Sequence, residues 1–165
     1  MRHIQWKLWG VALFLALVGL RCAPPKRVPS LVKPTQVEVE GARPLIVSMT
    51  RMRKRPLRPG ELTPFAKAGS LWEYQVTLEN PSEVGVNLDR LLLTVQNLWG
   101  ASWGEDQPLN LRLEEGSERK VAVQARLTTT DPQDRSSLTG VQTLNFLGRD
   151  DDGGSINFTV RVPLD

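Results

Sequence analysis

The strongest constraint on the fold is a two-residue alternation of apolar and polar side chains. It is clearest in the C-terminal stretch SINFTVRVPL, residues 155–164, where every second side chain is apolar: Ile156, Phe158, Val160, Val162 and Leu164. Successive side chains of a β-strand point to opposite faces of the sheet, so this pattern predicts a strand with one buried face. An amphipathic helix needs apolar residues three and four positions apart, and the sequence after residue 20 has no such stretch.

The same alternation predicts strands along most of the sequence. We expect them at residues 44–49, 72–78, 84–88 continued by 91–95, 109–113, 121–127 and 141–148, with turns at NPSE, EEGSE and DDDGG. The stretch MRKRPLRPGELTP, residues 52–64, is expected to be a loop or a sheet edge, because its three prolines cannot donate hydrogen bonds within a sheet. Seven or eight strands with one apolar face each predict an all-β antiparallel sandwich, in which two sheets cover each other.

An apolar run near the N-terminus predicts export. Residues 8–20, LWGVALFLALVGL, carry no charge and follow the basic residues Arg2, His3 and Lys7. This run matches the apolar core of a signal peptide and is shorter than the about 20 residues that a membrane-spanning helix needs. We therefore expect residues 1–21 to form a helical signal or anchor segment ahead of the β-sandwich.

Cys22, the only cysteine of the chain, directly follows this segment. A cysteine placed there, with APP after it, resembles the attachment site of bacterial lipoproteins, where a diacylglycerol group is joined to the thiol. Arg21 departs from that pattern, which has glycine, alanine or serine before the cysteine, so an uncleaved anchor with an unmodified Cys22 stays open. Residues 22–36 hold four prolines and are expected to tether a domain of residues 37–165 to a membrane of the bacterial envelope, facing the periplasm or the cell surface.

Basic residues are concentrated ahead of residue 59. Residues 26–58 hold nine basic and two acidic residues, whereas residues 59–165 hold nine basic and sixteen acidic ones. The basic cluster RMRKRPLR contains Arg51, Arg53, Lys54, Arg55 and Arg58. It is expected either to lie against the acidic remainder of the domain or to face anionic lipid head groups. Nucleic-acid binding is not expected, because the cluster has no aromatic residue and an exported chain does not meet nucleic acid.

Two stretches in the middle of the domain carry a family resemblance. They are YQVTLENPSEVGVNLDRLLLTVQN and LNLRLEEGSERKVAVQARL. The Asn80-Pro81 turn, the strand Leu88–Val95 and the later stretch Gly116–Val123 resemble the late embryogenesis abundant type 2 family, over roughly residues 44–163. Ser82 stands where that family has a second asparagine. The resemblance implies an immunoglobulin-like or fibronectin III-like sandwich, no catalysis, and a protective or binding role in proteins that are often exported bacterial lipoproteins.

Few residues of the chain are suited to catalysis. The only histidine, His3, lies in the expected leader, and Cys22 lies on the expected tether, so Ser-His, Cys-His and histidine-bearing metal sites are excluded from the domain. Three consecutive aspartates, residues 150–152, lack the alternate spacing and the later acid of a calcium loop. Adjacent carboxylates such as Glu105 and Asp106 point apart on a strand. No enzyme activity, metal or cofactor is expected.

Two tryptophans are the candidate binding residues. Trp99 and Trp103 lie in LWGASWGEDQ, residues 98–107, which is expected to be a glycine-bearing loop. Two indoles there can form a platform for a sugar or a protein partner, or they can cap the end of the hydrophobic core. The sequence thus predicts a non-enzymatic envelope lipoprotein with a binding, structural or stress-protective role. The alternative is an accessory module that binds carbohydrate or protein through these tryptophans.

Overall fold

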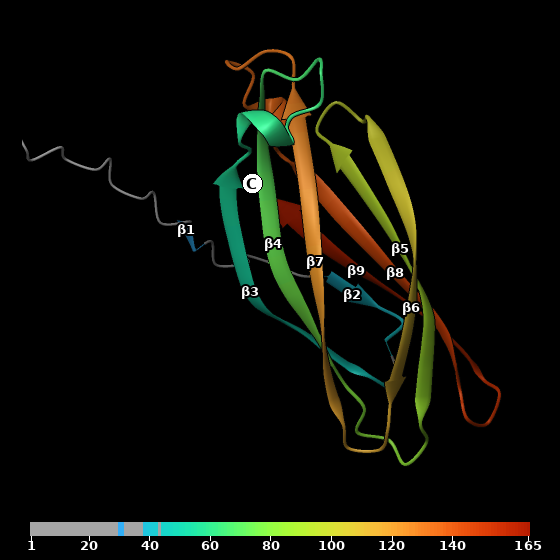
Figure 1. Cartoon of the computed structure of the whole chain (residues 1–165). Coiled ribbons are helices and arrows are strands. Elements are labelled where there is room, and N and C mark those ends of the chain that lie inside the picture. The colour runs from blue at the N-terminus through green and yellow to red at the C-terminus, as the bar shows by residue number, and fades with distance from the viewer. Residues whose placement is uncertain (1–29, 32–37, 43) are drawn as a thin grey trace, which may run out of the picture.

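The computed structural model describes residues 30–31, 38–42 and 44–165, and it forms a β-sandwich of two antiparallel sheets (Figure 1). The first sheet has the order β1-β3-β4-β7, with β1 (Ser30–Leu31), β3 (Ile46–Pro56), β4 (Ala68–Glu79) and β7 (Glu118–Thr129). The second has the order β2-β9-β8-β5-β6, with β2 (Glu38–Glu40), β5 (Val86–Asn97), β6 (Ser102–Leu113), β8 (Gly140–Asp150) and β9 (Ser155–Leu164). Two short 3-10 helices, η1 (Pro59–Glu61) and η2 (Ser136–Leu138), lie in connections. The predicted all-β sandwich is confirmed.

The hydrophobic core lies between the inner faces of the two sheets. The alternating residues of β9 are all buried, as the sequence predicts, and so are Trp72, Tyr74, Val76 and Leu78 of β4. Phe146 of β8 stacks on its cross-strand partner Phe158, with ring centroids 4.7 Å apart and planes 9° from parallel. The facing of β8, which its sequence leaves ambiguous, is set by the inward residues Gln142, Leu144 and Phe146.

A β-bulge in β5 reverses which residues face the core. Leu88 pairs with Gly148 of β8 and Arg90 pairs with Leu147, so Asp89 is an extra residue in β5. The inward positions consequently change from even to odd numbers, from Leu88 to Leu91. The two apolar stretches that the sequence shows on either side of Asp89 are therefore one continuous strand.

The stretch expected to be a loop or a sheet edge begins as an edge strand, and a second stretch expected to be a loop is largely strand. Residues 52–56 form the end of β3, which is an edge strand except where β1 pairs with it at Arg53 and Lys54. Residues 102–107 form the start of β6, so the connection between β5 and β6 is only residues 98–101. The expectation of a long loop at residues 98–107 was wrong. It rested on Gly100 and Gly104, whereas β5 supplies a continuous pairing partner for residues 102–107.

The connections gather at two opposite ends of the sandwich. The upper end in Figure 1 consists of residues 57–67, 98–101 and 130–139. The lower end includes the connections 80–85, 114–117 and 151–154. The last of these is the predicted DDDGG hairpin turn, in which Gly153 has a φ of +86°, a left-handed conformation that glycine adopts readily. The expected leader, residues 1–21 with Arg21 at its end, lies outside the described residues, and so does Cys22.

Candidate ligand-binding cleft

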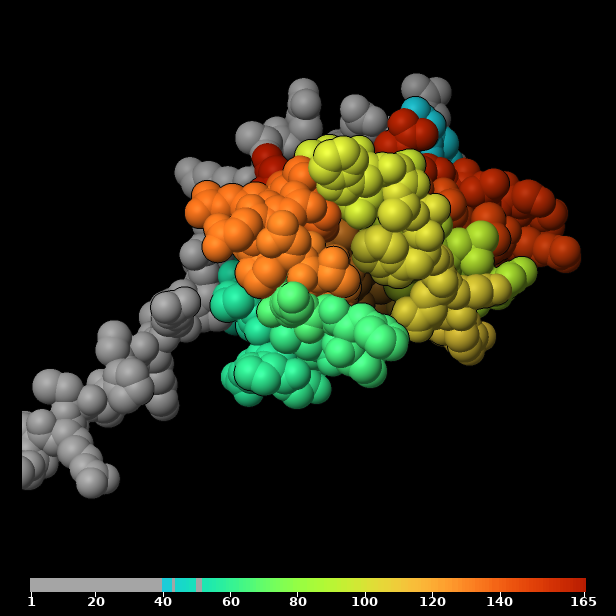
Figure 2. Space-filling model, turned by 90° about the horizontal axis from the view of Figure 1, so that it is seen from above, coloured from blue at the N-terminus to red at the C-terminus, as the bar shows by residue number. Residues whose placement is uncertain are grey.

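A cleft of about 320 Å³ opens between β6 and β7, the outermost strands on the same side of the two sheets. Trp103 and Glu105 of β6 line one wall, and Gln124 and Arg126 of β7 line the other. The remaining lining includes Leu93, Val95 and Gln142 from the core face of the second sheet. Figure 2 shows the molecule hollowed near its upper end, among atoms coloured orange, yellow and green.

The floor of the cleft is tied together by a buried polar bridge between the sheets. Tyr74 Oη of β4 donates to Gln142 Oε1 of β8 at 2.6 Å, and Gln142 Nε2 donates to the backbone carbonyl of Gln124 on β7 at 3.1 Å. Gln142 is only 1% exposed and Tyr74 only 3% exposed. Burial raises the pKa of Tyr74 well above its ordinary range, so its hydroxyl remains a neutral donor. The bridge fixes the spacing of the sheets directly below the cleft.

Sequence reasoning missed Gln142. A signal was present, because Gln142 occupies the first inward position of an alternating stretch that continues with Leu144 and Phe146. A polar residue at such a position must find hydrogen-bond partners inside the protein.

The structure brings only one of the two candidate tryptophans to the cleft. Trp103 is on β6, opposite the core residue Val95, and is 44% exposed in the cleft wall. Trp99 is on the β5–β6 turn and is 71% exposed, so it does not cap the core. The turn itself is held by Asn97, whose Oδ1 accepts hydrogen bonds from the backbone amides of Trp99 and Ala101 at 3.1 and 3.0 Å. The two indoles therefore come from different elements.

The basic cluster is divided between the two faces of β3. Lys54 is the cross-strand partner of the core residue Trp72, and its Nζ lies 4.1 Å from the centre of the Trp72 ring. Burial lowers the pKa of Lys54, and the nearby Asp165 opposes this shift. Arg53 and Arg58 are exposed, and the side chain of Arg51 is outside the described part of the chain. The five basic residues thus do not form one uniform patch.

Arg55 is committed to an ion pair. Its guanidinium donates two hydrogen bonds of 2.7 Å to the carboxylate of Glu61, which also accepts from the backbone amide of Arg58 at 2.8 Å. The bonds from Arg55 are the main reason that the pKa of Glu61 falls to about 2. This pair joins the cluster to an acid of the adjoining turn. Both sequence expectations for the cluster stay open.

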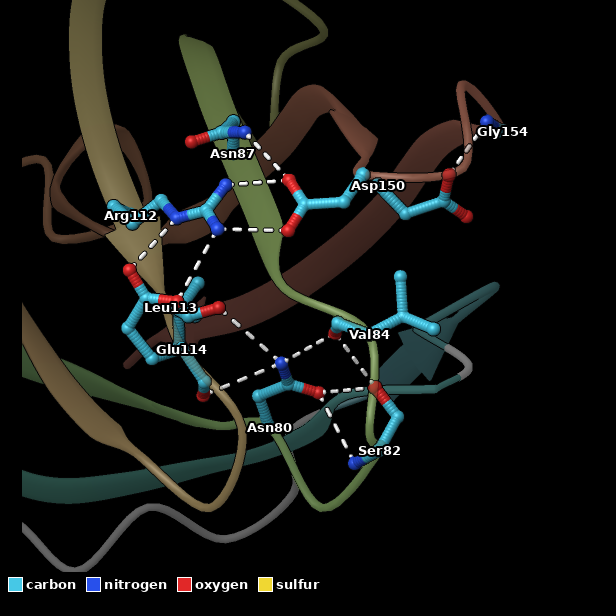
Figure 3. A network of polar contacts seen from close by, with 10 residues as sticks. Asn80, Ser82, Val84, Asn87, Arg112, Leu113, Glu114, Asp150 and Gly154 are labelled. Atoms are coloured by element: carbon cyan, nitrogen blue, oxygen red, sulfur yellow. Dashed lines mark hydrogen bonds and ion pairs between the residues drawn. The ribbon is translucent and has the colours of Figure 1, made fainter.

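Asn80, which carries part of the family resemblance, is a structural hub at the lower end (Figure 3). Its side chain is completely buried, and Nδ2 donates to the carbonyl oxygens of Val84 at 2.9 Å and Leu113 at 3.2 Å. Its Oδ1 accepts from the amide and the hydroxyl of Ser82. Its backbone carbonyl accepts from the amide of Gly116 at 2.8 Å. The two stretches that resemble the family are therefore joined through Asn80.

A second lower-end interaction joins β6 to the β8–β9 turn. Arg112 donates two hydrogen bonds to the carboxylate of Asp151, at 2.5 and 2.7 Å, and a third, of 2.9 Å, to Glu114. The bonds from Arg112 lower the pKa of both carboxyl groups. Gly85 lies against this cluster, because a Cβ atom there would meet Asp151 Oδ2 at 2.5 Å. Asp151 is thus part of an ion-pair cluster that closes the lower end.

The other carboxylates considered from the sequence are also placed. Asp106 forms an ion pair with Arg90, whereas Glu105 lines the cleft, so the two neighbours point apart as expected. In the part of the chain that the structure describes, no group of three or more His, Cys, Asp or Glu side chains is arranged to hold a metal ion. No helix within residues 30–31, 38–42 and 44–165 has the length and apolar composition needed to cross a bilayer.

Comparison with known proteins gives structural likenesses alone. No protein-family model and no curated protein matches the sequence. The chain is similar to the X-ray structure of Northeast Structural Genomics Consortium target SoR45, with 10% identity and a TM-score of 0.47 over 78% of this chain and 82% of that one. It is also similar to a Bordetella pertussis protein solved under the name ApaA, with 14% identity and a TM-score of 0.48 over 73% of this chain and 88% of that one. Likenesses at this level assign neither a ligand nor an activity.

Proposed function

We propose that the protein is a non-enzymatic lipoprotein of a bacterial envelope, anchored through Cys22, whose β-sandwich acts by binding. The support for the anchor comes from the sequence, where an apolar run of signal-peptide length ends directly before the only cysteine. Of the proline-rich residues 22–36, those ahead of β1 would then separate the membrane from the domain. A structural or stress-protective role without a dedicated ligand is the other form of this proposal.

We also place the domain closest to fibronectin III-like sandwiches and to the late embryogenesis abundant type 2 family. Strand order supports the first part, since β3-β4-β7 packs against β9-β8-β5-β6, with β6 attached to β5 rather than to β7. In a constant-type immunoglobulin domain the corresponding strand belongs to the other sheet. The likeness to the late embryogenesis abundant type 2 family is supported by Asn80, which contacts both stretches that resemble that family. These contacts give the Asn-Pro turn a structural role.

The observation that carries a binding role is the cleft between β6 and β7. It combines a half-exposed indole, Trp103, and its neighbour Glu105 on one side with Gln124 and Arg126 of β7 on the other. An aromatic face stacks on the apolar face of a sugar ring, and surrounding polar groups bond to its hydroxyls. The Tyr74–Gln142 bridge holds the cleft walls in place without using these side chains. The cleft therefore favours an oligosaccharide as the ligand.

Binding of the detergent-solubilised full chain to an oligosaccharide array tests this ligand class. We expect Trp103→Ala to abolish binding, and we expect Trp99→Ala to retain it, because Trp99 does not line the cleft. Phe65→Ala is the matched control, since Phe65 is an aromatic residue that is 84% exposed elsewhere. Thermal unfolding of each variant shows that it is folded. Binding that survives Trp103→Ala, or no binding to any oligosaccharide, would overturn the sugar proposal.

A further inference from the structure

The upper end of the sandwich exposes an unusual set of large apolar side chains. Phe65 is 84% exposed on the segment leading into β4, and Leu98 and Trp99 are 68% and 71% exposed on the β5–β6 turn. The backbone amide of Leu98 donates to the carbonyl of Thr139 at 3.3 Å, which joins the β5–β6 turn to the neighbouring connection after β7. Apolar side chains at the tips of neighbouring connections are costly in water unless something covers them.

Charge differs sharply between the two ends. The lower connections 80–85, 114–117 and 151–154 hold five acidic residues and no lysine or arginine. A fourth lower connection, residues 41–45, includes Arg43, which lies outside the described residues. The upper connections 57–67, 98–101 and 130–139 hold three acidic and three basic residues, and the basic end of β3 leads into them. The lower connections are therefore acidic and the upper ones neutral overall, so an anionic surface would repel the lower end more strongly than the upper one.

The direction of β1 relates the proposed anchor to the upper end. β1 runs antiparallel to β3, with Ser30 opposite Lys54 and Leu31 opposite Arg53, and β3 runs towards the upper end. The chain therefore enters β1 from the upper end. Cys22 precedes Ser30 by eight residues, which span at most about 29 Å when fully extended. A membrane that holds Cys22 lies within that distance of β1.

We propose that the upper end of the sandwich, with Phe65, Leu98 and Trp99 at its tips, rests on the anionic lipid surface in which the chain is anchored. This inference depends on the proposed membrane anchor. Tryptophan and phenylalanine partition into the interface between head groups and acyl chains, and nearby lysine and arginine are attracted to anionic head groups. Exposed Arg58 and Lys67 supply the positive charge on the segment that carries Phe65. The acidic lower end would then face away from the lipid.

Tryptophan fluorescence of the full chain in vesicles tests the orientation. The vesicles contain phosphatidylglycerol and phosphatidylcholine, with or without bromine-labelled acyl chains that quench nearby indoles. The difference between wild type and Trp99→Phe isolates the emission of Trp99. We expect this emission to shift to shorter wavelength and to lose more than half of its intensity in brominated vesicles. We expect the quenching to weaken in phosphatidylcholine alone and in the double variant Arg58→Glu, Lys67→Glu.

A reporter at the opposite end is the matched control. Ile46 is 51% exposed at the lower end of β3, so Ile46→Trp in the Trp99→Phe background should emit as an indole in water and stay unquenched. Quenching of this reporter as strong as that of Trp99 would overturn the orientation. Unquenched Trp99 emission from protein that floats with the vesicles in a density gradient would overturn the inference and leave the anchor intact. If the protein does not float with the vesicles, the anchor falls as well.

Discussion

Tyr74 and Gln142 join the two sheets through a 2.6 Å hydrogen bond in the interior of the sandwich. Their strands, β4 and β8, belong to different sheets, and the rest of the interface between these sheets is mainly apolar. Gln142 extends the connection to the edge strand β7 through the carbonyl of Gln124. The pair thus positions the edge of the first sheet that forms one wall of the cleft.

Tyr74→Phe should destabilise the protein. The substitution leaves Gln142 Oε1 buried without its donor, which costs about 1–3 kcal/mol in the free energy of unfolding. Urea unfolding measures this difference. Gln124→Ala is the control, because Gln142 binds the backbone carbonyl of Gln124 and not its exposed side chain. A Tyr74→Phe variant as stable as wild type would show that the bridge contributes nothing.

Asn80→Ala should be among the most damaging polar substitutions. It removes the buried amide that serves the carbonyls of Val84 and Leu113. A buried polar group that loses its partner costs about 1–3 kcal/mol, and the carbonyl of Val84 keeps a second donor, the hydroxyl of Ser82. Asn87→Ala is the matched control, since Asn87 makes one exposed contact of 3.4 Å to Asp151 and should change stability by less than about 0.5 kcal/mol. Equal effects of the two variants on denaturant unfolding would contradict the role of Asn80 as a hub.

Gly148→Ala should destabilise the second sheet through crowding. A Cβ atom at position 148 would lie 2.0 Å from the backbone carbonyl oxygen of Asn87, which cannot move without disturbing β5. Overpacking of this kind costs about 1–3 kcal/mol or more. Gly60→Ala is the control, because a Cβ atom there meets nothing within 4 Å. A thermal unfolding midpoint for Gly148→Ala equal to that of Gly60→Ala would refute this prediction.

The contribution of the Arg55–Glu61 pair should depend on pH. Bonding by Arg55 keeps the pKa of Glu61 at about 2 in the folded protein, below the ordinary value of 4.5. A carboxyl group whose pKa is lowered by folding stabilises the folded state above its unfolded pKa, and this stabilisation is lost as the pH falls through the folded pKa. The stability difference between wild type and Glu61→Gln should therefore be present at neutral pH and fade from about pH 4.5 to about pH 2. Urea unfolding at a series of pH values measures it, and a difference that persists unchanged in acid would contradict the assignment.

Local alternation was sufficient to predict the strands, and it failed where pairing overrides it. All five inward residues of β9 follow from period two alone. The bulge at Asp89 was not predicted, although the expected stretches 84–88 and 91–95 differ in whether their apolar positions are even or odd. The full length of β6 could not be predicted either. Its residues 102–106 are all exposed, and pairing with β5 holds them in the sheet.

The cleft could not be predicted from the sequence. Trp103 and Arg126 border the same cleft only because β6 and β7 are outermost strands of different sheets, which depends on long-range strand order. The sequence did identify Trp103 as a candidate, through the general value of exposed indoles in binding. The separation of Trp99 from Trp103 follows from where β6 begins, at Ser102.

Metabolic labelling with a fatty-acid analogue tests the proposed lipoprotein most directly. The full chain and its Cys22→Ser variant are expressed in a bacterial host that processes lipoproteins, and the incorporated label is compared after equal recovery of protein. We expect label in the native chain and none in Cys22→Ser, because diacylglycerol would be joined to the only thiol of the sequence. Equal labelling of both chains, or no label in either, would contradict it.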